Sequence, residues 1–348
     1  GLVKADGLPD YTPPAEGASM GGGGATLEPG ISDEPLDNPP YWGQEGVHEI
    51  YREWRSVLGS YPGDRILAAE AWVDPLPKVA KWVRPDEMHQ AFNFAYLETP
   101  WEAAELRTVI DDSLKAFSEV GAPSTWVLSN HDVVRHSSRL ALTAASLQGH
   151  GVGPKSEGKP DAAIGLRRAR AASTMMLALP GSSYIYQGEE LGLPEAIELP
   201  DAARQDPTWF RTNGERYGRD GCRVPIPWEA ESPAFGFSPT GKSWLPQPVD
   251  WATYARDAQQ GVAGSTLELY RLALALREEY QLGLGSLEWQ DGYADGVIAY
   301  RNGDVLVIAN TGPTPVTLPS GHDVLLASDA VPSSQLGADV TVWLRAQR

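Results

Sequence analysis

The chain has 348 residues, which is enough for one large domain and a small one. Its 28 Lys and Arg residues face 46 Asp and Glu residues, and the net charge of -18 argues against nucleic acid or an anionic membrane as a partner, because both need basic patches. The single cysteine, Cys222, excludes an internal disulfide and predicts a reducing, cytoplasmic compartment, and no apolar run is long enough to span a membrane.

Residues 5 to 45 are rich in Pro, Gly and acidic residues. A structureless segment of this length is uncommon inside a compact domain unless it has a function. We expect a loop over the mouth of a barrel, with a flexible linker as the alternative. From Gly46 to Gly59, apolar residues recur at the spacing of one helix face, and Ser60-Tyr-Pro-Gly63 ends the predicted helix.

A short apolar strand, Ile66 to Ala69, follows and ends on a carboxylate, Glu70. A glutamate inside such a run is expensive to bury as a charge, so we expect it to be neutral, paired or functional. Ala71 and Trp72 offer further apolar surroundings of the kind that raise the pKa of a general acid. The alternative is an edge-strand glutamate that simply faces water.

Asp74 to Trp82 predicts a short helix, and Met88 to Leu97 alternates well enough to predict a second strand. We expect His89, within that strand, to be structural rather than catalytic. Thr99-Pro-Trp-Glu102 has the form of a capping box, with a hydroxyl at the N-cap, proline at the first helical position and glutamate at the third. The helix predicted to start there turns these apolar side chains inward: Leu106, Val109, Ile110, Leu114 and Phe117.

The next apolar strand, Thr125 to Leu128, breaks abruptly into Asn130, His131 and Asp132. A buried strand with acidic and imidazole groups at its C-terminal end is typical of an α/β-barrel active site, where the chemistry lies on the loops after the strands. The alternative is a loop in which Asn130 or Asp132 caps the next helix. Together, Glu70 and Asp132 give two acids on separate strand ends, which is what glycosidic bond cleavage requires.

A polar loop at residues 149 to 165 precedes a predicted helix, Leu166 to Leu179, which Pro180-Gly181 ends. Ser182 to Tyr186 predicts a fourth strand, so that the predicted strands lie near residues 66, 90, 126 and 184. Two further segments complete this part of the chain, an insertion dense in Pro, Trp and Arg and a final helix: Leu191 to Trp251 and Leu267 to Tyr280.

From Leu284 onward the pattern changes to short β runs. They are Gly296 to Tyr300, Asp304 to Ala309, Val316 to Leu318, Val324 to Leu326 and Val340 to Leu344. Arg301-Asn-Gly-Asp304 supplies turn residues between the first two. We therefore expect a structural all-β domain at residues 283–348, after a barrel-type domain at residues 1–282.

Four segments, taken in order, resemble signatures of the α-amylase superfamily, glycoside hydrolase family 13. Ile66 to Trp72 looks like the third signature, Trp126 to Asp132 like the fourth, and Pro180 to Glu189 like the signature on the eighth barrel strand. Gly218 to Trp228 is similar to the arginine-bearing segment of α-glucosidases and trehalose synthases. The resemblance covers the whole chain. It implies an α/β fold, the second half of a TIM (β/α)8 barrel followed by a small C-terminal all-β sandwich domain.

The resemblance also implies an activity, the retaining hydrolysis of terminal α-glucosidic bonds in short maltose- or isomaltose-type oligosaccharides. Glu70 would be the acid/base, and Asp132 with His131 would hold ring hydroxyls of the glucose at the cleavage point. Arg219 or Arg223 would reach the same sugar, although either could instead form a structural ion pair. No cofactor is implied, and calcium could bind only through residues outside this chain. Two alternatives stay open: a glucosyl-transferring isomerase of the trehalose synthase kind, and a non-catalytic barrel relative.

A barrel of this type needs eight strands, and four are predicted here. In the family, the nucleophilic aspartate lies on the fourth strand, and Gly1 to Pro9 looks like the segment just beyond it. We therefore expect this chain to be the C-terminal part of an enzyme, inactive by itself, with the missing N-terminal half of the barrel as a partner. Asp6 and Asp10 are poor substitutes for the nucleophile, because neither follows an apolar strand.

Overall fold

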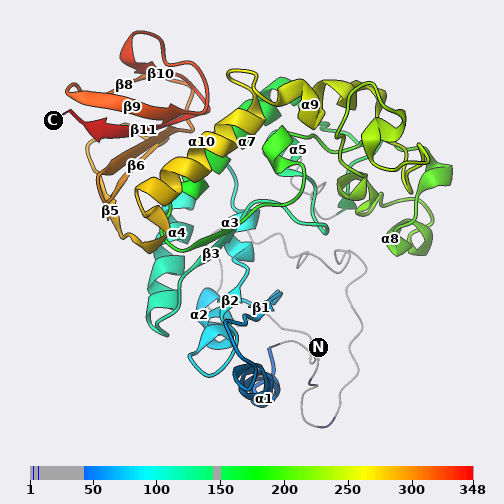
Figure 1. The fold of residues 1–348 in the computed structure, drawn as a ribbon, viewed down its shortest axis with the longest axis horizontal. Helices are drawn as coiled ribbons and strands as arrows, with labels where there is room; N and C mark the ends of the chain where they lie inside the picture. Colours follow the sequence, from blue (N-terminus) through cyan, green and yellow to red (C-terminus); the bar gives the residue numbers. More distant parts are fainter. Residues whose placement is uncertain (1–2, 4–6, 8–42, 144–149, 348) are drawn as a thin grey trace. The chain divides into compact units, whose positions relative to one another are not determined.

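The computed structural model describes residues 3, 7, 43–143 and 150–347 (Figure 1). They form two compact units. Unit 1 consists of Gly1–Glu98 and Thr108–Val127, and unit 2 of Thr99–Arg107 and Leu128–Arg348. The expected boundary between residues 282 and 283 stays a prediction. Apart from Gly7 and residues 43–45, the predicted loop at residues 5 to 45 lies outside the described residues, as do Asp6 and Asp10.

Unit 1 alternates helices with short strands. In chain order its elements are α1 (Val47–Gly59), β1 (Ala68–Ala69), α2 (Leu76–Ala80), the 3-10 helix η1 (Lys81–Val83), β2 (Gln90–Ala91), α3 (Phe94–Glu98), most of α4 (Ala103–Ser118) and β3 (Thr125–Val127). β1 and β2 pair in parallel, with Ala69 opposite Ala91, as the strands of an α/β fold do. Side chains of α1, η1 and both strands pack into one apolar core around Trp82.

The strand predicted from Met88 to Leu97 is present but much shorter, because only Gln90–Ala91 forms β2 and α3 begins at Phe94. Asn93 causes the break. Its Oδ1 accepts the backbone N–H of Tyr96 at 3.0 Å, as an N-cap does, and its Nδ2 donates to Ser113 Oγ at 2.7 Å. His89 has a structural contact, since its Nδ1 accepts the backbone N–H of Leu67 at 3.0 Å.

The predicted capping box at Thr99 is wrong, because α4 begins at Ala103. The N–H of Glu102 donates to the Pro100 carbonyl at 2.8 Å, so a tight turn occupies the residues that were expected to form the first helical turn. The inward face of the helix is as predicted at three positions, since Leu106, Ile110 and Phe117 are buried.

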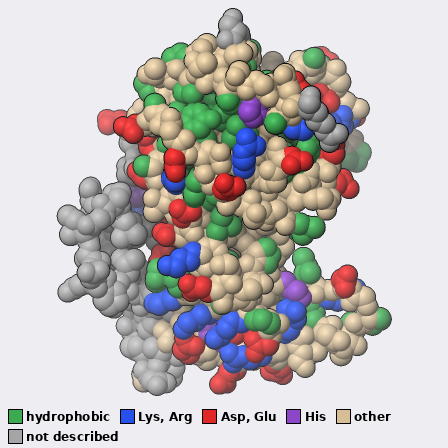
Figure 2. Space-filling model, turned by 90° about the vertical axis from the view of Figure 1, so that its left-hand side faces the viewer, with side chains coloured by type: hydrophobic (Ala, Val, Ile, Leu, Met, Phe, Trp, Pro, Cys, Tyr) green, Lys and Arg blue, Asp and Glu red, His purple; other side chains and the backbone are tan. Residues whose placement is uncertain are grey.

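Charged side chains in unit 1 pair around one buried carboxylate, Glu87. Its Oε1 accepts Arg52 Nη2 at 3.1 Å and Arg84 Nε at 2.8 Å. Its Oε2 lies 2.5 Å from His48 Nδ1. Figure 2 shows Lys and Arg side chains mixed with Asp and Glu at the lower end of the view, near α1 and α2. Arg52 and Arg84 thus neutralise a buried anion, which is the way buried charges are tolerated.

Unit 2 combines helices of very different lengths with many 3-10 turns. Besides the first residues of α4, the α-helices among its described residues are α5 (His136–Arg139), α7 (Ala162–Leu177), α8 (Pro207–Arg211), α9 (Arg256–Gln259) and α10 (Thr266–Glu279), and strand β4 is Ser182–Tyr184. The 3-10 helices are η2 (Glu189–Leu191), η3 (Asp201–Ala203), η4 (Asp220–Arg223), η5 (Pro233–Gly236), η6 (Val249–Tyr254), η7 (Leu282–Leu284) and η8 (Pro332–Ser334). Asp161 caps α7 by accepting the N–H of Ile164 at 2.9 Å, so the predicted polar loop ends at residue 161.

The C-terminal strands form a five-stranded antiparallel sheet in the order β5-β6-β7-β11-β9, and a second sheet pairs β8 with β10. Their bounds are β5 (Leu287–Trp289), β6 (Val297–Asn302), β7 (Val305–Asn310), β8 (Val316–Thr317), β9 (His322–Ala327), β10 (Gln335–Leu336) and β11 (Val340–Ala346). Figure 1 shows α7 and α10 beside the larger sheet. Trp343 Nε1 on β11 donates to the Thr174 carbonyl of α7 at 3.0 Å, and Tyr300 OH on β6 donates to that of Met175 at 2.7 Å.

Among the described residues, no helix is both long and apolar enough to cross a membrane.

Candidate active site

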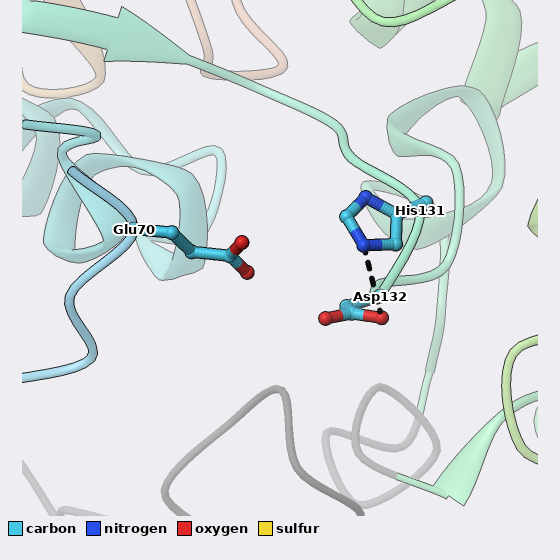
Figure 3. A group of neighbouring side chains, drawn as sticks. All are labelled: Glu70, His131 and Asp132. Atoms are coloured by element: carbon cyan, nitrogen blue, oxygen red, sulfur yellow. Dashed lines mark ion pairs between the residues drawn. The ribbon is translucent and has the colours of Figure 1, made fainter. Parts of the chain in front are cut away.

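Glu70 directly follows β1, at the C-terminal end of the parallel pair (Figure 3). Its side chain is exposed, whereas Ala69 and Ala71 on either side are buried. Alternation along the extended chain accounts for this difference, because successive side chains point to opposite faces. The next residue, Trp72, stacks on Phe94 with ring centroids 3.8 Å apart. The apolar neighbours therefore fix the backbone of Glu70 and leave its carboxylate accessible.

Asp132 lies in the loop after β3, and its side chain is only 10% exposed. Its Oδ1 accepts Arg219 Nη1 at 2.9 Å and Arg223 Nη2 at 2.6 Å, and lies 3.7 Å from His131 Nε2 (Figure 3). No hydrogen bond from the described residues reaches the other oxygen, Oδ2, which points away from His131 in Figure 3. Two guanidinium groups and an imidazole thus converge on one oxygen of the carboxylate.

Asn130 shapes the loop that presents Asp132. Its Oδ1 accepts the backbone N–H of Asp132 at 2.7 Å, which is the hydrogen bond of an Asx turn. The alternative in which Asn130 or Asp132 caps the next helix is wrong, because α5 begins at His136 with Arg135 in the N-cap position and no side-chain cap. The polar residues after β3 therefore serve the loop itself.

Arg219 is the residue before η4 and Arg223 is its last residue, and both reach the loop after β3. Arg223 Nε donates to the His131 carbonyl at 2.7 Å, while its Nη2 holds Asp132. The one guanidinium therefore fixes two successive residues of that loop. Both predicted sugar-binding arginines thus lie together with His131 and Asp132 within unit 2, whereas Glu70 belongs to unit 1. The convergence of Glu70 and Asp132 on one ligand stays a prediction.

Asp206 is a site residue that the sequence reasoning missed. Its carboxylate accepts Arg219 Nε at 2.7 Å, Arg219 Nη2 at 3.4 Å and the backbone N–H of Arg219 at 2.8 Å. Burial opposes ionisation of Asp206, but the hydrogen bonds from Arg219 and from the Thr208 N–H outweigh it and hold its pKa well below the usual value. Asp206 before Pro207 is a recognisable N-cap signal, yet nothing in its local sequence connects it with Arg219.

Arg135 was also missed, and it joins three segments of unit 2. Its guanidinium is buried and donates to the carbonyls of Gln187 at 2.7 Å and Cys222 at 2.9 Å. Tyr186 OH donates to the same Cys222 carbonyl at 2.9 Å. Burial raises the pKa of the Cys222 thiol well above its usual value, so the thiol is un-ionised and unsuited to act as a nucleophile.

A buried chain of hydrogen bonds lies behind the loop after β3. His136 Nδ1 is 2.9 Å from Ser129 Oγ, and its Nε2 is 3.1 Å from Ser173 Oγ. Tyr270 OH lies 2.6 Å from Ser173 Oγ and 3.3 Å from Glu189 Oε2. Burial lowers the pKa of His136 to about 3 and raises that of Glu189 to about 8. Both side chains are therefore uncharged at neutral pH, which suits their dry surroundings.

The charges around Asp132 favour a neutral ligand over a metal cation. Carboxylate and imidazole groups such as those of Asp132 and His131 are common metal ligands. However, Asp132 Oδ1 already faces the guanidinium groups of Arg219 and Arg223. A dication placed there would be repelled by both of them. Hydroxyl groups, which donate a hydrogen bond without adding charge, fit the open oxygen better.

Residues 32–284 match the family described as "Alpha amylase, catalytic domain". The chain belongs to the α-amylase family. The resemblance expected from the four sequence segments is thereby confirmed.

Relatives of this α-amylase family member include α-glucosidases and transferases. The chain is 36% identical over 197 residues to a "Probable alpha-glucosidase" of Rhizobium meliloti (strain 1021). That alignment covers 56% of this chain and 31% of the relative. It is 26% identical over 340 residues to the "Trehalose synthase/amylase TreS" of Mycobacterium tuberculosis (strain CDC 1551 / Oshkosh), covering 83% of this chain and 52% of that protein. The crystal structure of the α-glucosyl transfer enzyme XgtA aligns with a TM-score of 0.68 and 28% identity over 87% of this chain and 55% of that one.

The chain thus spans about half the length, or less, of these relatives. The structural neighbours are TIM-barrel enzymes of the same family, and the fold class predicted from the sequence is confirmed. Strands β1 to β4 are the barrel-type strands, and the antiparallel sheet of β5, β6, β7, β9 and β11 is the expected C-terminal all-β part.

Proposed function

We propose that the chain takes part in the retaining hydrolysis of terminal α-glucosidic bonds in short gluco-oligosaccharides of the maltose or isomaltose type. The observation that carries the proposal is the Asp132 carboxylate, with Oδ1 held by Arg219 and Arg223 and Oδ2 open. A carboxylate oxygen fixed in this way accepts a hydrogen bond from a sugar ring hydroxyl. Such bonds strengthen as positive charge develops on the sugar in the transition state. The family membership and the α-glucosidase relative support the same reaction class.

In this proposal, the exposed carboxyl of Glu70 protonates the leaving oxygen and then, as a carboxylate, activates the water that releases glucose. Asp132 and His131 hold hydroxyls of the glucose at the cleavage point. Arg223 keeps Asp132 in place and reaches the same sugar together with Arg219. The reaction requires Glu70 and Asp132 to face one sugar ring.

Retaining hydrolysis also requires a carboxylate nucleophile, and none of the described residues is assigned that role. We propose that it comes from the part of the barrel outside these 348 residues, so that this chain alone does not turn over p-nitrophenyl α-glucoside. Release of nitrophenol that disappears in Glu70→Gln would contradict the external nucleophile and still support the role of Glu70. With the complete barrel assembled, Glu70→Gln is expected to lower kcat by about 10²- to 10⁴-fold.

Sugar binding by the chain tests Asp132 separately from catalysis. Titration calorimetry with maltose is expected to give a dissociation constant that Asp132→Ala weakens roughly tenfold or more, because a charge-assisted hydrogen bond is lost. Asp304→Ala is the matched control, since Asp304 is an exposed acid in the β6–β7 hairpin. Equal affinities of wild type and Asp132→Ala would contradict the proposal.

A second candidate is a glucosyl-transferring isomerase of the trehalose synthase kind, which the similarity to TreS and to XgtA favours. The two candidates share their site residues and differ in whether water reaches the covalent intermediate. Product analysis after incubation of the assembled enzyme with maltose separates them, because hydrolysis gives only glucose and isomerisation gives trehalose. The joint presence of Glu70, His131 and Asp132 argues against a non-catalytic relative.

A cytoplasmic location is also proposed, because the single cysteine, Cys222, is unpaired.

A further inference from the structure

We propose that Asp206 is a positioning residue that keeps one oxygen of Asp132 open for the sugar by holding Arg219 in a single orientation. The inference rests on the sugar-binding role proposed for Asp132. Asp206 is a buried residue in the turn region before α8, outside the four segments that resemble the family signatures.

The Arg219 guanidinium is divided between two acids. Its Nε and Nη2 donate to Asp206 at 2.7 and 3.4 Å, and only Nη1 donates to Asp132, at 2.9 Å. A guanidinium beside a single carboxylate prefers a bidentate contact, with two N–H groups on two oxygens. Without Asp206, we expect Arg219 to turn and engage both oxygens of Asp132. The oxygen proposed to bind the sugar would then be occupied.

Asp206 is itself firmly held. Its side chain is fully buried, and Oδ1 accepts the Thr208 N–H at 2.8 Å. Its own backbone N–H donates to Asp220 Oδ2 at 3.1 Å. Gly218 has φ +67° and approaches so closely that a Cβ there would lie 2.8 Å from Asp206 Cγ. Asp206 is therefore in place before any ligand arrives, as a positioning group must be.

The balance of charge around Arg219 favours the same change. Arg219 and Arg223 face two carboxylates, Asp132 and Asp206. Loss of the Asp206 charge leaves both guanidinium groups with Asp132 alone. The attraction that remains draws Arg219 toward Asp132, in the same direction as the bidentate preference.

Asp206→Asn tests the inference, with Asp161→Asn as the matched control. Asparagine keeps the size of Asp206 and an acceptor for the Thr208 N–H, but removes the charge. Asp161 is also a helix-capping aspartate of unit 2, since it accepts the Ile164 N–H at the start of α7, and it does not contact Arg219. Asp206→Asn is expected to weaken maltose binding in calorimetry by about tenfold, whereas Asp161→Asn leaves the affinity unchanged. Equal weakening in both, or none in Asp206→Asn, would overturn the inference.

A second comparison shows whether Asp206 acts through Arg219. In an Arg219→Ala background, Asp206→Asn is expected to cause no further loss of maltose affinity, because the group that it positions is gone. Additive losses would overturn the inference. If Asp206→Asn does not fold, Asp206→Ser replaces it, since serine also caps a helix but carries no charge.

The structure of the variant keeps the inference separate from the proposed function. In crystals of Asp206→Asn, Arg219 is expected to donate to both oxygens of Asp132. An unchanged Arg219 side chain would overturn the positioning role even if the wild-type chain binds maltose. If the wild-type chain binds no sugar, the proposed function fails, and the orientation of Arg219 in the variant still decides the positioning role.

Discussion

The ion pairs of Asp132 differ from ordinary surface ion pairs because each arginine is also attached elsewhere. Arg223 donates to the His131 carbonyl, and Arg219 donates to Asp206. Exposed ion pairs contribute little, since flexible side chains must be ordered to form them. Here the second attachment of each guanidinium has already ordered it. The Asp132 carboxylate is therefore held in one position at a small entropic cost.

Arg223→Lys tests this dual attachment at the scale of one residue. A lysine ammonium is a point charge and cannot reproduce the planar fork that donates to His131 and Asp132 together. We expect maltose affinity, measured by calorimetry, to fall about tenfold although the charge is kept. Arg211→Lys, on the exposed face of α8, is the control that should leave the affinity unchanged. Full affinity in Arg223→Lys would show that charge alone suffices.

Among the elements, long helices with local signals were predictable and short strands were less so. The prediction for α10 is within one residue at each end, because Ser265 caps the helix locally by accepting the Glu268 N–H. The error after β2 has the opposite origin. Asn93 ends the extended segment with the help of Ser113, and no local pattern announces a partner from another helix. The three-residue strand β5 was not predicted, because it carries too few residues for a period.

The same distinction applies to the candidate site. Glu70 and Asp132 were predictable because a polar residue at the end of an apolar strand contrasts with its neighbours. Asp206 and Arg135 were not, since each acts through groups that folding brings from distant segments. Asp206 lies among short turns that show no hydrophobic periodicity. Its aspartate is also fully explained as the N-cap of α8, so the sequence offers no reason to look for a second role.

Asn93→Ala tests the start of α3. The variant loses the cap on Tyr96 and leaves Ser113 Oγ without its donor, so we expect unfolding in urea to show a loss of about 1–3 kcal/mol. Asn93→Ser is the matched variant, because serine keeps a cap but cannot reach Ser113 in the same way, and it should lose less. Equal stability of Asn93→Ala and wild type would show that α3 does not depend on this side chain.

On the scale of the whole molecule, the chain is strongly acidic, and among the buried carboxyl groups of unit 2 are two glutamates whose pKa is raised by burial. Burial raises the pKa of Glu189 to about 8 and that of Glu195 to about 7. Because both carboxyl groups hold their protons more tightly in the folded than in the unfolded chain, the free energy of unfolding falls as the pH rises from about 4.5 to 8. His136, with its pKa lowered to about 3, has the opposite effect and loses stability as pH falls from 6.5 toward 3.

Glu189→Gln tests this pH dependence. Between pH 6.5 and 8, we expect the unfolding free energy of wild type to fall by up to about 1.4 kcal/mol per pH unit for this one group. The slope should be smaller in Glu189→Gln, whose amide oxygen still accepts the Tyr186 N–H. Urea unfolding at several pH values measures it. Glu198→Gln, which removes an exposed carboxylate, is the control, and equal slopes in all three proteins would contradict the prediction.

The end of α7 has a consequence for how the chain is built. A helix leaves its last four carbonyls without partners in the helix, and here Trp343 and Tyr300 supply donors to those of Thr174 and Met175. The sheet that carries both donors follows α7 in the chain. The Met175 carbonyl also accepts the Ala178 N–H at 3.1 Å, whereas the Thr174 carbonyl depends on Trp343 and must hydrogen-bond to water until the sheet has folded against the helix. The end of α7 therefore reaches its final packing only after the later sheet has formed.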